Sequence, residues 1–129
     1  MDKIEELRRW HAAQESHRAA QHALLHGFLA TSASRSYYAC FQAMWVALGN
    51  PPRGEWKHGG LIQHFCLGRW TNPVTLPSSL AGLCKKLLHL YHLRLDADYR
   101  ALPIAGTKAR EGLNTVAEVF QLVTQSKTF

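Results

Sequence analysis

Several features that would mark a specialised class of protein are missing from this sequence. Its 129 residues contain no apolar run close to the roughly 20 residues that a membrane-spanning helix needs. The opening stretch, MDKIEELRRW, is charged from the start and lacks the apolar core of a secretory signal. These absences argue against a membrane or secreted protein, and we expect a cytoplasmic location without membrane contact.

Cysteine is scarce as well. Cys40, Cys66 and Cys84 lie far apart inside apolar stretches, and no two of them form a Cys-x-x-Cys pair. An odd number of separated cysteines argues against a disulfide framework and against a thiolate zinc site. We therefore expect three buried free thiols.

The histidines do not indicate a metal site either. Two pairs have helical spacing, His22 with His26 and His89 with His92, but neither has a thiolate or a supporting carboxylate nearby. We predict no metal and no cofactor.

The composition that is present is that of one folded domain covering residues 1–129. Apolar residues make up 47% and charged residues 19%, which is typical of globular proteins and not of disordered ones. The net charge is +6, which favours an anionic partner such as RNA or a nucleotide. No run of basic residues is longer than two, so the charge does not indicate a stripe for binding a nucleic-acid duplex.

Helical periodicity dominates the chain, and no alternating strand pattern persists. We predict helices over about 3–29, from Ser32 or Ser34 to about 48, over 57–69, from Ser78 or Ser79 to about 98, and after the Pro103 and Gly106 breakers. Between them lie loops over 49–54 and 71–77. Short loops between amphipathic helices predict an all-α, up-and-down bundle of four to five helices.

Each predicted helix has an apolar side. The first one opens with Asp2 and Glu5 spaced as a capping box, and Gly27 is placed to mark its last turn. The second is apolar around most of its circumference, which predicts a central helix. The expected inward residues are Ile4, Leu7, His11, Leu24, Leu25 and Phe28; Ala33, Tyr37, Phe41, Met44, Trp45 and Leu48; Leu61, Ile62 and Phe65; Leu80, Leu83, Leu87, Leu90 and Leu95; and Ala109, Leu113, Val116, Phe120 and Val123.

Three stretches in register carry a family resemblance. Residues 33–43 read ASRSYYACFQA, residues 57–65 read KHGGLIQHF, and residues 90–99 read LYHLRLDADY. They resemble the R-x-Y-Y-A-x-F-x-A, K-H-S-G-V-I…F and L-x-x-L-R-x-x-A-D-Y elements of prokaryotic HEPN proteins. The closing helix with Ala117 and Phe120 agrees too, so the resemblance covers nearly the whole chain.

This resemblance implies a helical bundle that usually forms a homodimer. Many HEPN proteins are encoded beside a minimal nucleotidyltransferase, often as toxin–antitoxin or phage-defence pairs. Catalytic members are metal-independent ribonucleases with an Arg-x4-6-His motif assembled from two subunits. Arginine can hold a phosphate, and histidine can move a proton near neutral pH.

The chain departs from that motif at its matching position. After Arg94 and four intervening residues the chain has Tyr99 in place of histidine, and tyrosine is a poor base at neutral pH. Arg53 and His58 do have the spacing, but they flank the loop that enters the third helix. Arg94, Tyr99, His58 and Arg53 are therefore the catalytic candidates, should the protein be an enzyme.

The candidates for binding RNA or nucleotide are Arg35, Lys57, His58, Arg94, Asp98 and Tyr99. Each has a structural alternative: Arg94 and Asp98 are spaced as an intrahelical ion pair, and Arg35 is spaced as a solvated residue of a first turn. Gly59 and Gly60 either let an anion approach the helix start or let two helices cross closely. One of Tyr37 and Tyr38 should be buried and the other at a rim.

The tryptophans also have two interpretations. They could stack bases, but packing is the commoner role for such residues. They are Trp10, Trp45, Trp56 and Trp70.

Three functional hypotheses follow. The first is a HEPN-like binding or regulatory module that recognises RNA or nucleotide and assembles with itself or with a nucleotidyltransferase. The second is a metal-independent endoribonuclease toxin that uses Arg53 with His58, or Arg94 with another histidine such as His58 or His92. The third is a structural helical adaptor.

Overall fold

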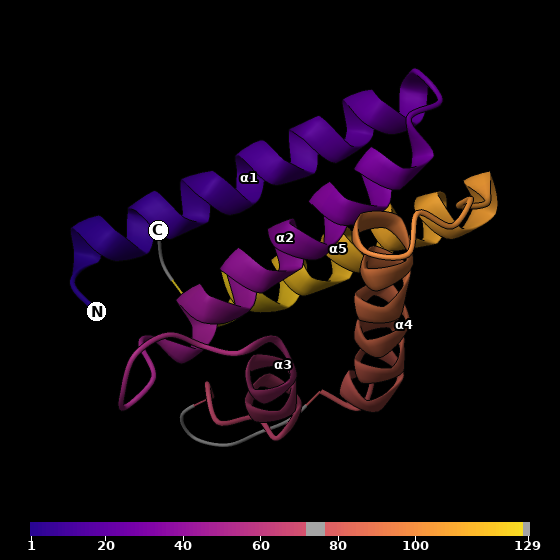
Figure 1. Ribbon diagram of the computed structural model, residues 1–129. Helices are drawn as coiled ribbons and strands as arrows, with labels where there is room; N and C mark the ends of the chain where they lie inside the picture. Colours follow the sequence, from indigo (N-terminus) through magenta and orange to yellow (C-terminus); the bar gives the residue numbers. More distant parts are fainter. Residues whose placement is uncertain (72–76, 128–129) are drawn as a thin grey trace.

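The computed structural model describes residues 1–71 and 77–127, and in these ranges its elements are all helices, joined by loops (Figure 1). The helices are α1 (Lys3–Leu25), α2 (Leu29–Leu48), α3 (His58–Cys66), α4 (Leu80–Asp98) and α5 (Gly106–Ser126). The all-α prediction is thereby confirmed. Most of the loop expected at 71–77 lies outside the described residues. Among the described helices, none is both long and apolar enough to cross a membrane.

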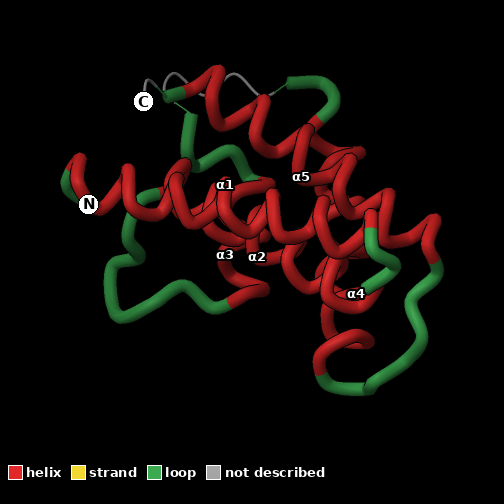
Figure 2. Tube along the Cα trace, turned by 90° about the horizontal axis from the view of Figure 1, so that it is seen from above, coloured by secondary structure: helices red, strands yellow, loops and turns green. Residues whose placement is uncertain are grey.

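Helix α2 is the centre of the bundle, as its apolar circumference predicts. It contacts each of the other four helices, and Figures 1 and 2 both show it beside α1. Its buried residues cover most of the helix surface: Ser32, Ala33, Ser34, Ser36, Tyr37, Ala39, Cys40, Ala43, Met44, Trp45, Val46 and Ala47.

The up-and-down arrangement holds only for part of the bundle. Helices α1 and α2 run antiparallel, but α5 runs in the same direction as α2, and α4 crosses them (Figure 1). The crossing is close because α5 has Gly112 there: a Cβ at Gly112 would lie 3.1 Å from Cδ1 of Leu90 on α4 and 3.5 Å from Cβ of Ser36 on α2. The connections before α3 and before α4 are long enough for the chain to change direction, which periodicity alone does not reveal.

Helix α1 begins as predicted and ends early. The Asp2 carboxylate accepts a hydrogen bond from the Glu5 N–H at 2.8 Å, which satisfies a free donor of the first turn. At the other end Gly27 has φ of 78°, and the Phe28 N–H donates to the Ala23 carbonyl at 2.8 Å. This Schellman-type end stops the helix at Leu25, so the expected extension to residue 29 is wrong.

The predicted inward side of α1 is also wrong. Ile4 is 71% exposed, Leu25 81% and Phe28 61%. The helix instead buries Trp10 together with Ala13, Ala20 and Ala23. Alanine side chains let two helix backbones come close, so the small residues can face the neighbouring helices while Ile4 and Leu25 stay exposed.

The serines expected to cap α2 lie inside the helix. It begins at Leu29, and the Ser32 hydroxyl donates across to the Ala20 carbonyl of α1 at 2.9 Å. Ser79 does occupy the position before α4 but makes no capping hydrogen bond with its side chain. Helix α3 is shorter than the predicted 57–69, whereas α4 ends at Asp98 as expected.

Most of the other predicted inward residues are buried. Five are only half-buried: Phe41, Leu48, Leu95, Leu113 and Phe120. The fully buried ones on α3, α4 and α5 include Leu61, Ile62, Phe65, Leu80, Leu83, Leu87, Leu90, Ala109, Val116 and Val123.

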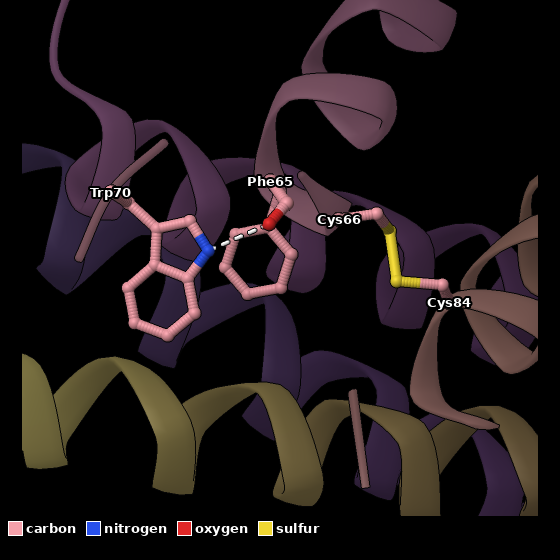
Figure 3. Close-up of a disulfide and its surroundings, with 4 residues drawn as sticks. All are labelled: Phe65, Cys66, Trp70 and Cys84. Atoms are coloured by element: carbon pink, nitrogen blue, oxygen red, sulfur yellow. Dashed lines mark hydrogen bonds between the residues drawn. A yellow bond between two sulfur atoms is a disulfide. The ribbon is translucent and has the colours of Figure 1, made fainter. Parts of the chain in front are cut away.

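The expectation of three free thiols is wrong for two of them. Cys66 and Cys84 form a disulfide, with their Cα atoms 6.0 Å apart (Figure 3). Cys40 is free and buried, and burial raises the pKa of its thiol well above the usual range. The spacing of the cysteines could not reveal the pair, because it forms only where the end of α3 meets the start of α4.

Candidate anion-binding site

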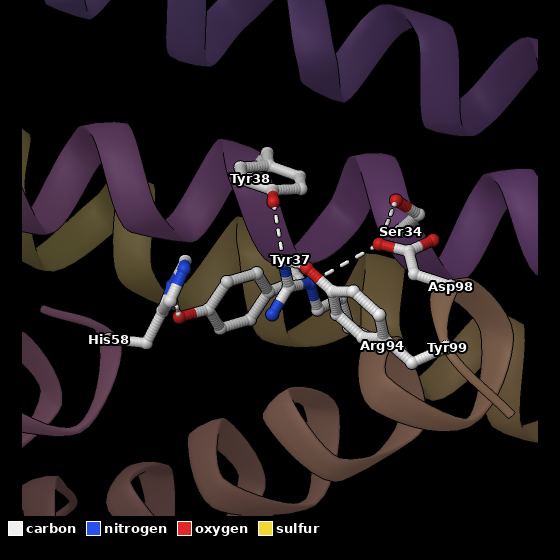
Figure 4. A network of polar contacts seen from close by, with 7 residues as sticks. All are labelled: Ser34, Tyr37, Tyr38, His58, Arg94, Asp98 and Tyr99. Atoms are coloured by element: carbon white, nitrogen blue, oxygen red, sulfur yellow. Dashed lines mark hydrogen bonds and ion pairs between the residues drawn. The ribbon is translucent and has the colours of Figure 1, made fainter.

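Seven polar and aromatic side chains meet where α2, α3 and α4 come together (Figure 4). Helix α2 supplies three of them, α3 supplies His58 at its first position, α4 supplies Arg94 and Asp98, and Tyr99 follows directly. We call this group the arginine cluster: Ser34, Tyr37, Tyr38, His58, Arg94, Asp98 and Tyr99.

Arg94 is the centre of the cluster, and only 4% of it is exposed. Its Nη2 donates to the hydroxyl oxygens of Tyr38 at 2.7 Å and of Tyr99 at 3.2 Å. Its guanidinium carbon lies 5.0–5.4 Å from the ring centres of Tyr37, Tyr38 and Tyr99. The cation is thus held by aromatic rings and hydroxyls from two helices.

Asp98 completes the support of Arg94. The Arg94 Nε donates to Asp98 Oδ2 at 3.2 Å, which confirms the intrahelical ion pair expected from their spacing. The Ser34 hydroxyl of α2 donates to the same carboxylate oxygen at 3.1 Å. Asp98 therefore links α4 to α2 as well as balancing the arginine.

The Arg94 side chain stays charged and keeps one donor group available. Burial alone would lower the pKa of Arg94, but Tyr38, Tyr99 and Asp98 act the other way and the pKa is raised overall. Arginine has five N–H donors. Among the described residues, no hydrogen-bond acceptor meets its Nη1.

His58 contacts the cluster through Tyr37. The Tyr37 hydroxyl lies 2.7 Å from Nδ1 of His58, and the two ring centres are 5.4 Å apart. Burial and the Arg94 charge both lower the pKa of His58, so its imidazole is neutral at pH 7. Burial raises the pKa of Tyr37 far above its usual range, although Arg94 opposes the shift.

The burial of Tyr37 favours one direction for its hydrogen bond with His58. Tyr37 keeps its proton, and among the described residues its hydroxyl has only Nδ1 of His58 as a partner. If the hydroxyl accepted from Nδ1, its own buried proton would have no acceptor, so the favoured arrangement is a donating hydroxyl with the imidazole proton on Nε2. In this tautomer the outer nitrogen of His58 is a hydrogen-bond donor.

The two neighbouring tyrosines divide as predicted. Tyr37 is fully buried, and Tyr38 is half-buried with its hydroxyl on Arg94. Arg35 lies beside them, its guanidinium carbon 5.0 Å from the Tyr38 ring centre. The helix begins at Leu29, so Arg35 lies in its second turn and not in the first turn as expected.

The other sequence candidates lie at or beyond the edge of the cluster. Lys57 is exposed and precedes His58 at the start of α3. Arg53 is exposed in the preceding loop and, within the described chain, makes no hydrogen bond or ion pair. A Cβ at Gly60 would meet nothing within 4 Å, so Gly60 is not needed for a close helix crossing.

The remaining histidines stand apart from the cluster. His89 and His92 line a groove of about 700 Å³ between α4 and α5, together with Leu90, Leu93 and Gly112. The rings of His22 and His26 are 4.3 Å apart on the exposed side of α1. Within residues 1–71 and 77–127, no group of three or more metal-ligating side chains is present.

The tryptophans pack in place rather than presenting free faces. The indole N–H groups of Trp45, Trp56 and Trp70 donate to Asn50 Oδ1, the Gly49 carbonyl and the Phe65 carbonyl at 2.9, 2.7 and 2.7 Å. The Trp70 ring also stacks on Phe65, with ring centres 4.9 Å apart (Figure 3). Trp10 is buried against Phe120.

Sequence reasoning missed three members of the cluster. Ser34 was expected as a helix cap, and Tyr37 and Tyr38 were expected only as a core residue and a rim residue. The hydroxyl of Tyr37 reaches His58, 21 residues away in sequence, and that of Ser34 reaches Asp98, 64 residues away. The available signal was the presence of serines and tyrosines on a largely apolar helix, because buried polar groups need partners.

Comparisons with known proteins do not place the chain in a family. A scan against protein-family models finds no match, and a search of curated proteins finds no similar sequence.

Proposed function

We propose that this chain is a HEPN-like module that binds the phosphate groups of RNA or a nucleotide at the arginine cluster. As the resemblance implies, it would act as a homodimer, with a minimal nucleotidyltransferase as a partner in a toxin–antitoxin or phage-defence pair. The observation that carries the proposal is the buried, charged guanidinium of Arg94, which is fixed on three sides and retains an unused donor.

The fixed position of Arg94 favours anion binding. A guanidinium already held by tyrosines and a carboxylate loses little freedom when a phosphate oxygen arrives at Nη1. A low-dielectric setting also strengthens such a contact relative to one on an exposed arginine. The net charge of +6 adds long-range attraction for an anionic ligand.

His58 and the start of α3 supply further donors next to Tyr37. The Nε2–H of neutral His58 can donate to a phosphate oxygen. The first N–H groups of α3 have no acceptor inside the helix, and the exposed Lys57 stands beside them. Arg35, over the Tyr38 ring, extends the basic side of the cluster.

The same geometry argues against a general base at His58. Proton abstraction from a ribose 2′-OH needs an imidazole nitrogen with a free lone pair. In this tautomer Nδ1 accepts a hydrogen bond from the Tyr37 hydroxyl and Nε2 carries a proton, so neither nitrogen has a free lone pair. Binding without cleavage is therefore the function that the cluster supports best.

A ribonuclease is the second candidate, on one specific observation. His58 and Arg94 come from different helices yet both lie beside the Tyr37 ring, at 5.4 Å each. This brings together an arginine and a histidine of the kinds found in catalytic HEPN proteins. Rotation of the Tyr37 hydroxyl away from Nδ1 would let the imidazole proton move there and free Nε2 as a base.

Incubation of the purified protein with labelled RNA in EDTA separates the two candidates, with Arg94→Ala and His58→Ala variants alongside. We expect retarded but intact RNA with the wild type, weaker binding with both variants, and binding that falls steeply with salt. Cleavage that disappears in a folded variant would establish the ribonuclease instead. No binding and no cleavage would leave the adaptor hypothesis.

A further inference from the structure

The Cys66–Cys84 disulfide joins the two helices that carry the key side chains of the cluster. Cys66 is the last residue of α3, whose first residue is His58, and Cys84 lies in the second turn of α4, which also carries Arg94. At 1.5 Å per residue, the bond is roughly 12 Å along α3 from His58 and roughly 15 Å along α4 from Arg94. It therefore joins the two helices at a point away from the cluster.

Helix α3 depends more than the other helices on contacts with the rest of the protein for its stability. It has nine residues, no side-chain cap at its start and three buried side chains, Leu61, Ile62 and Phe65. Isolated helices of this length are marginal in water. The tertiary contacts of α3 therefore decide how firmly His58 is held on Tyr37.

The two ends of α3 are fastened differently. The loop before it is pinned by the Trp45 and Trp56 indoles, which bond to Asn50 and to the Gly49 carbonyl. Its last turn is pinned by the disulfide and by the Trp70 indole on the Phe65 carbonyl (Figure 3). Of these fastenings only the disulfide can be removed by a chemical signal.

We propose that the Cys66–Cys84 disulfide is a reducible clip that holds α3 on α4 and keeps His58 against Tyr37, and that a dithiol reductant opens it. Both cysteines are half-buried, so a small dithiol can approach. Disulfides are rare in a reducing cytosol, and those that form there are usually transient or redox-sensing. Opening the clip would loosen His58 and weaken phosphate binding, a consequence that rests on the proposed function.

The exchange balances without any further reactant. A thiolate of the dithiol attacks one sulfur and displaces the other cysteine as a thiolate, which takes up a proton. The second thiol of the reductant then closes on its own mixed disulfide and releases the remaining cysteine. The protein gains two electrons and two protons, and the dithiol leaves as a cyclic disulfide.

The first readout does not involve RNA. Hydrogen exchange of the backbone amides is followed in the oxidised protein, in the protein reduced with dithiothreitol, and in a Cys66→Ser, Cys84→Ser double variant. Local opening governs exchange, so we expect amides of α3 to exchange about tenfold faster in the last two samples than in the oxidised protein. The exchange rates in α1 and α5 should not change. A Cys40→Ala variant should respond to the dithiol exactly as the wild type does, because Cys40 has no disulfide partner. Equal exchange of α3 in the oxidised and reduced wild type overturns the clip, whether or not the double variant folds.

The second readout is the affinity for a labelled single-stranded RNA. We expect a Kd about fivefold higher for the reduced protein and for the double variant, which reflects the loss of roughly one hydrogen-bonding group. Faster α3 exchange with an unchanged RNA affinity would overturn the link between clip and binding site. If the RNA binds neither the oxidised nor the reduced protein, the proposed function is wrong. The hydrogen-exchange result alone then tests whether the disulfide holds α3 in place.

Discussion

The interface of α1 with its neighbours and the interface of α4 with α2 differ in the kind of side chain that they bury. Helix α1 buries Trp10, three alanines and Glu6, and it leaves Ile4 and Leu25 exposed. Helix α4 buries Arg94 in a set of hydroxyls, rings and one carboxylate. The first interface depends mainly on the close packing of small residues, with a few polar contacts such as that of the Ser32 hydroxyl with the Ala20 carbonyl. The second depends on whether each buried polar group finds a partner.

This difference separates what holds the fold from what can do chemistry. Changes to the alanine interface should alter the free energy of unfolding and leave ligand binding alone in the molecules that remain folded. Changes to the arginine cluster should alter both, because its groups are structural partners and also the proposed ligand contacts. The following predictions test that separation, from the largest effect to the smallest.

Replacement of Arg94 by alanine should have the largest effect. It leaves Asp98, Tyr38 and Tyr99 without their common partner. We expect the free energy of unfolding to fall by roughly 2–3 kcal/mol. This is less than the cost of breaking a fully buried ion pair, because Asp98 is partly exposed. Urea denaturation measures it. Arg110→Ala on α5 removes an equal charge from an exposed position and should change stability by less than about 0.5 kcal/mol. Equal losses in the two variants would contradict the account.

Enlargement of the alanine interface should cost stability alone. Ala13 is fully buried on α1, and Ala13→Leu adds volume where the helices pack closely, so we expect a loss of about 1–3 kcal/mol. Ala12→Leu on the same helix is the control, because Ala12 is only half-buried. At a temperature where Ala13→Leu is still folded, its RNA affinity should equal that of the wild type. Reduced affinity there would show that the two regions are coupled.

Removal of the Tyr37 hydroxyl should have a smaller effect on stability but a diagnostic one on His58. Tyr37→Phe keeps the ring and removes the donor to Nδ1, at a cost of about 1 kcal/mol. Without that donor the imidazole can place its proton on either nitrogen. The ¹⁵N chemical shifts of the His58 ring should change from a single Nε2–H tautomer to a mixture, and an unchanged pattern would refute our assignment of the tautomer.

The pH dependence of stability should carry a small contribution from His58. Its pKa is lowered in the folded protein by burial and by Arg94, so the unfolded chain binds the proton more tightly. The folded state is therefore destabilised as the pH falls below the unfolded value of about 6.5, and stability rises with pH through that window. His58→Gln should flatten this part of the unfolding profile, leaving a remainder from His17, whose pKa is lowered too. A profile of unchanged steepness would contradict the shift.

Local patterns predicted the helices well and their partners poorly. The apolar circumference of α2 correctly predicted a central helix, and the four-residue spacing of Arg94 and Asp98 correctly predicted their ion pair. Both inferences depend only on neighbours along one helix. The inward side of α1 was mispredicted because large apolar residues were taken as buried, whereas the close helix approach selects alanine.

The parts that could not be predicted all depend on contacts between helices. The Cys66–Cys84 bond exists only because the end of α3 meets the start of α4. The contact of Tyr37 with His58 likewise depends on where α3 lies against α2. Periodicity reports which side of a helix is apolar, but it carries no information on which helix covers that side.

The central claim is that the fixed guanidinium of Arg94 binds a phosphate. The most direct measurement is the affinity of labelled single-stranded RNA for the wild type, Arg94→Gln and Arg110→Gln at matched salt, with the folded state of each verified by circular dichroism. We predict about 10- to 100-fold weaker binding for Arg94→Gln, as for the loss of a charged hydrogen bond, and less than about twofold for Arg110→Gln. Equal weakening in both variants would mean that the RNA responds only to net charge, and the proposed site would be wrong.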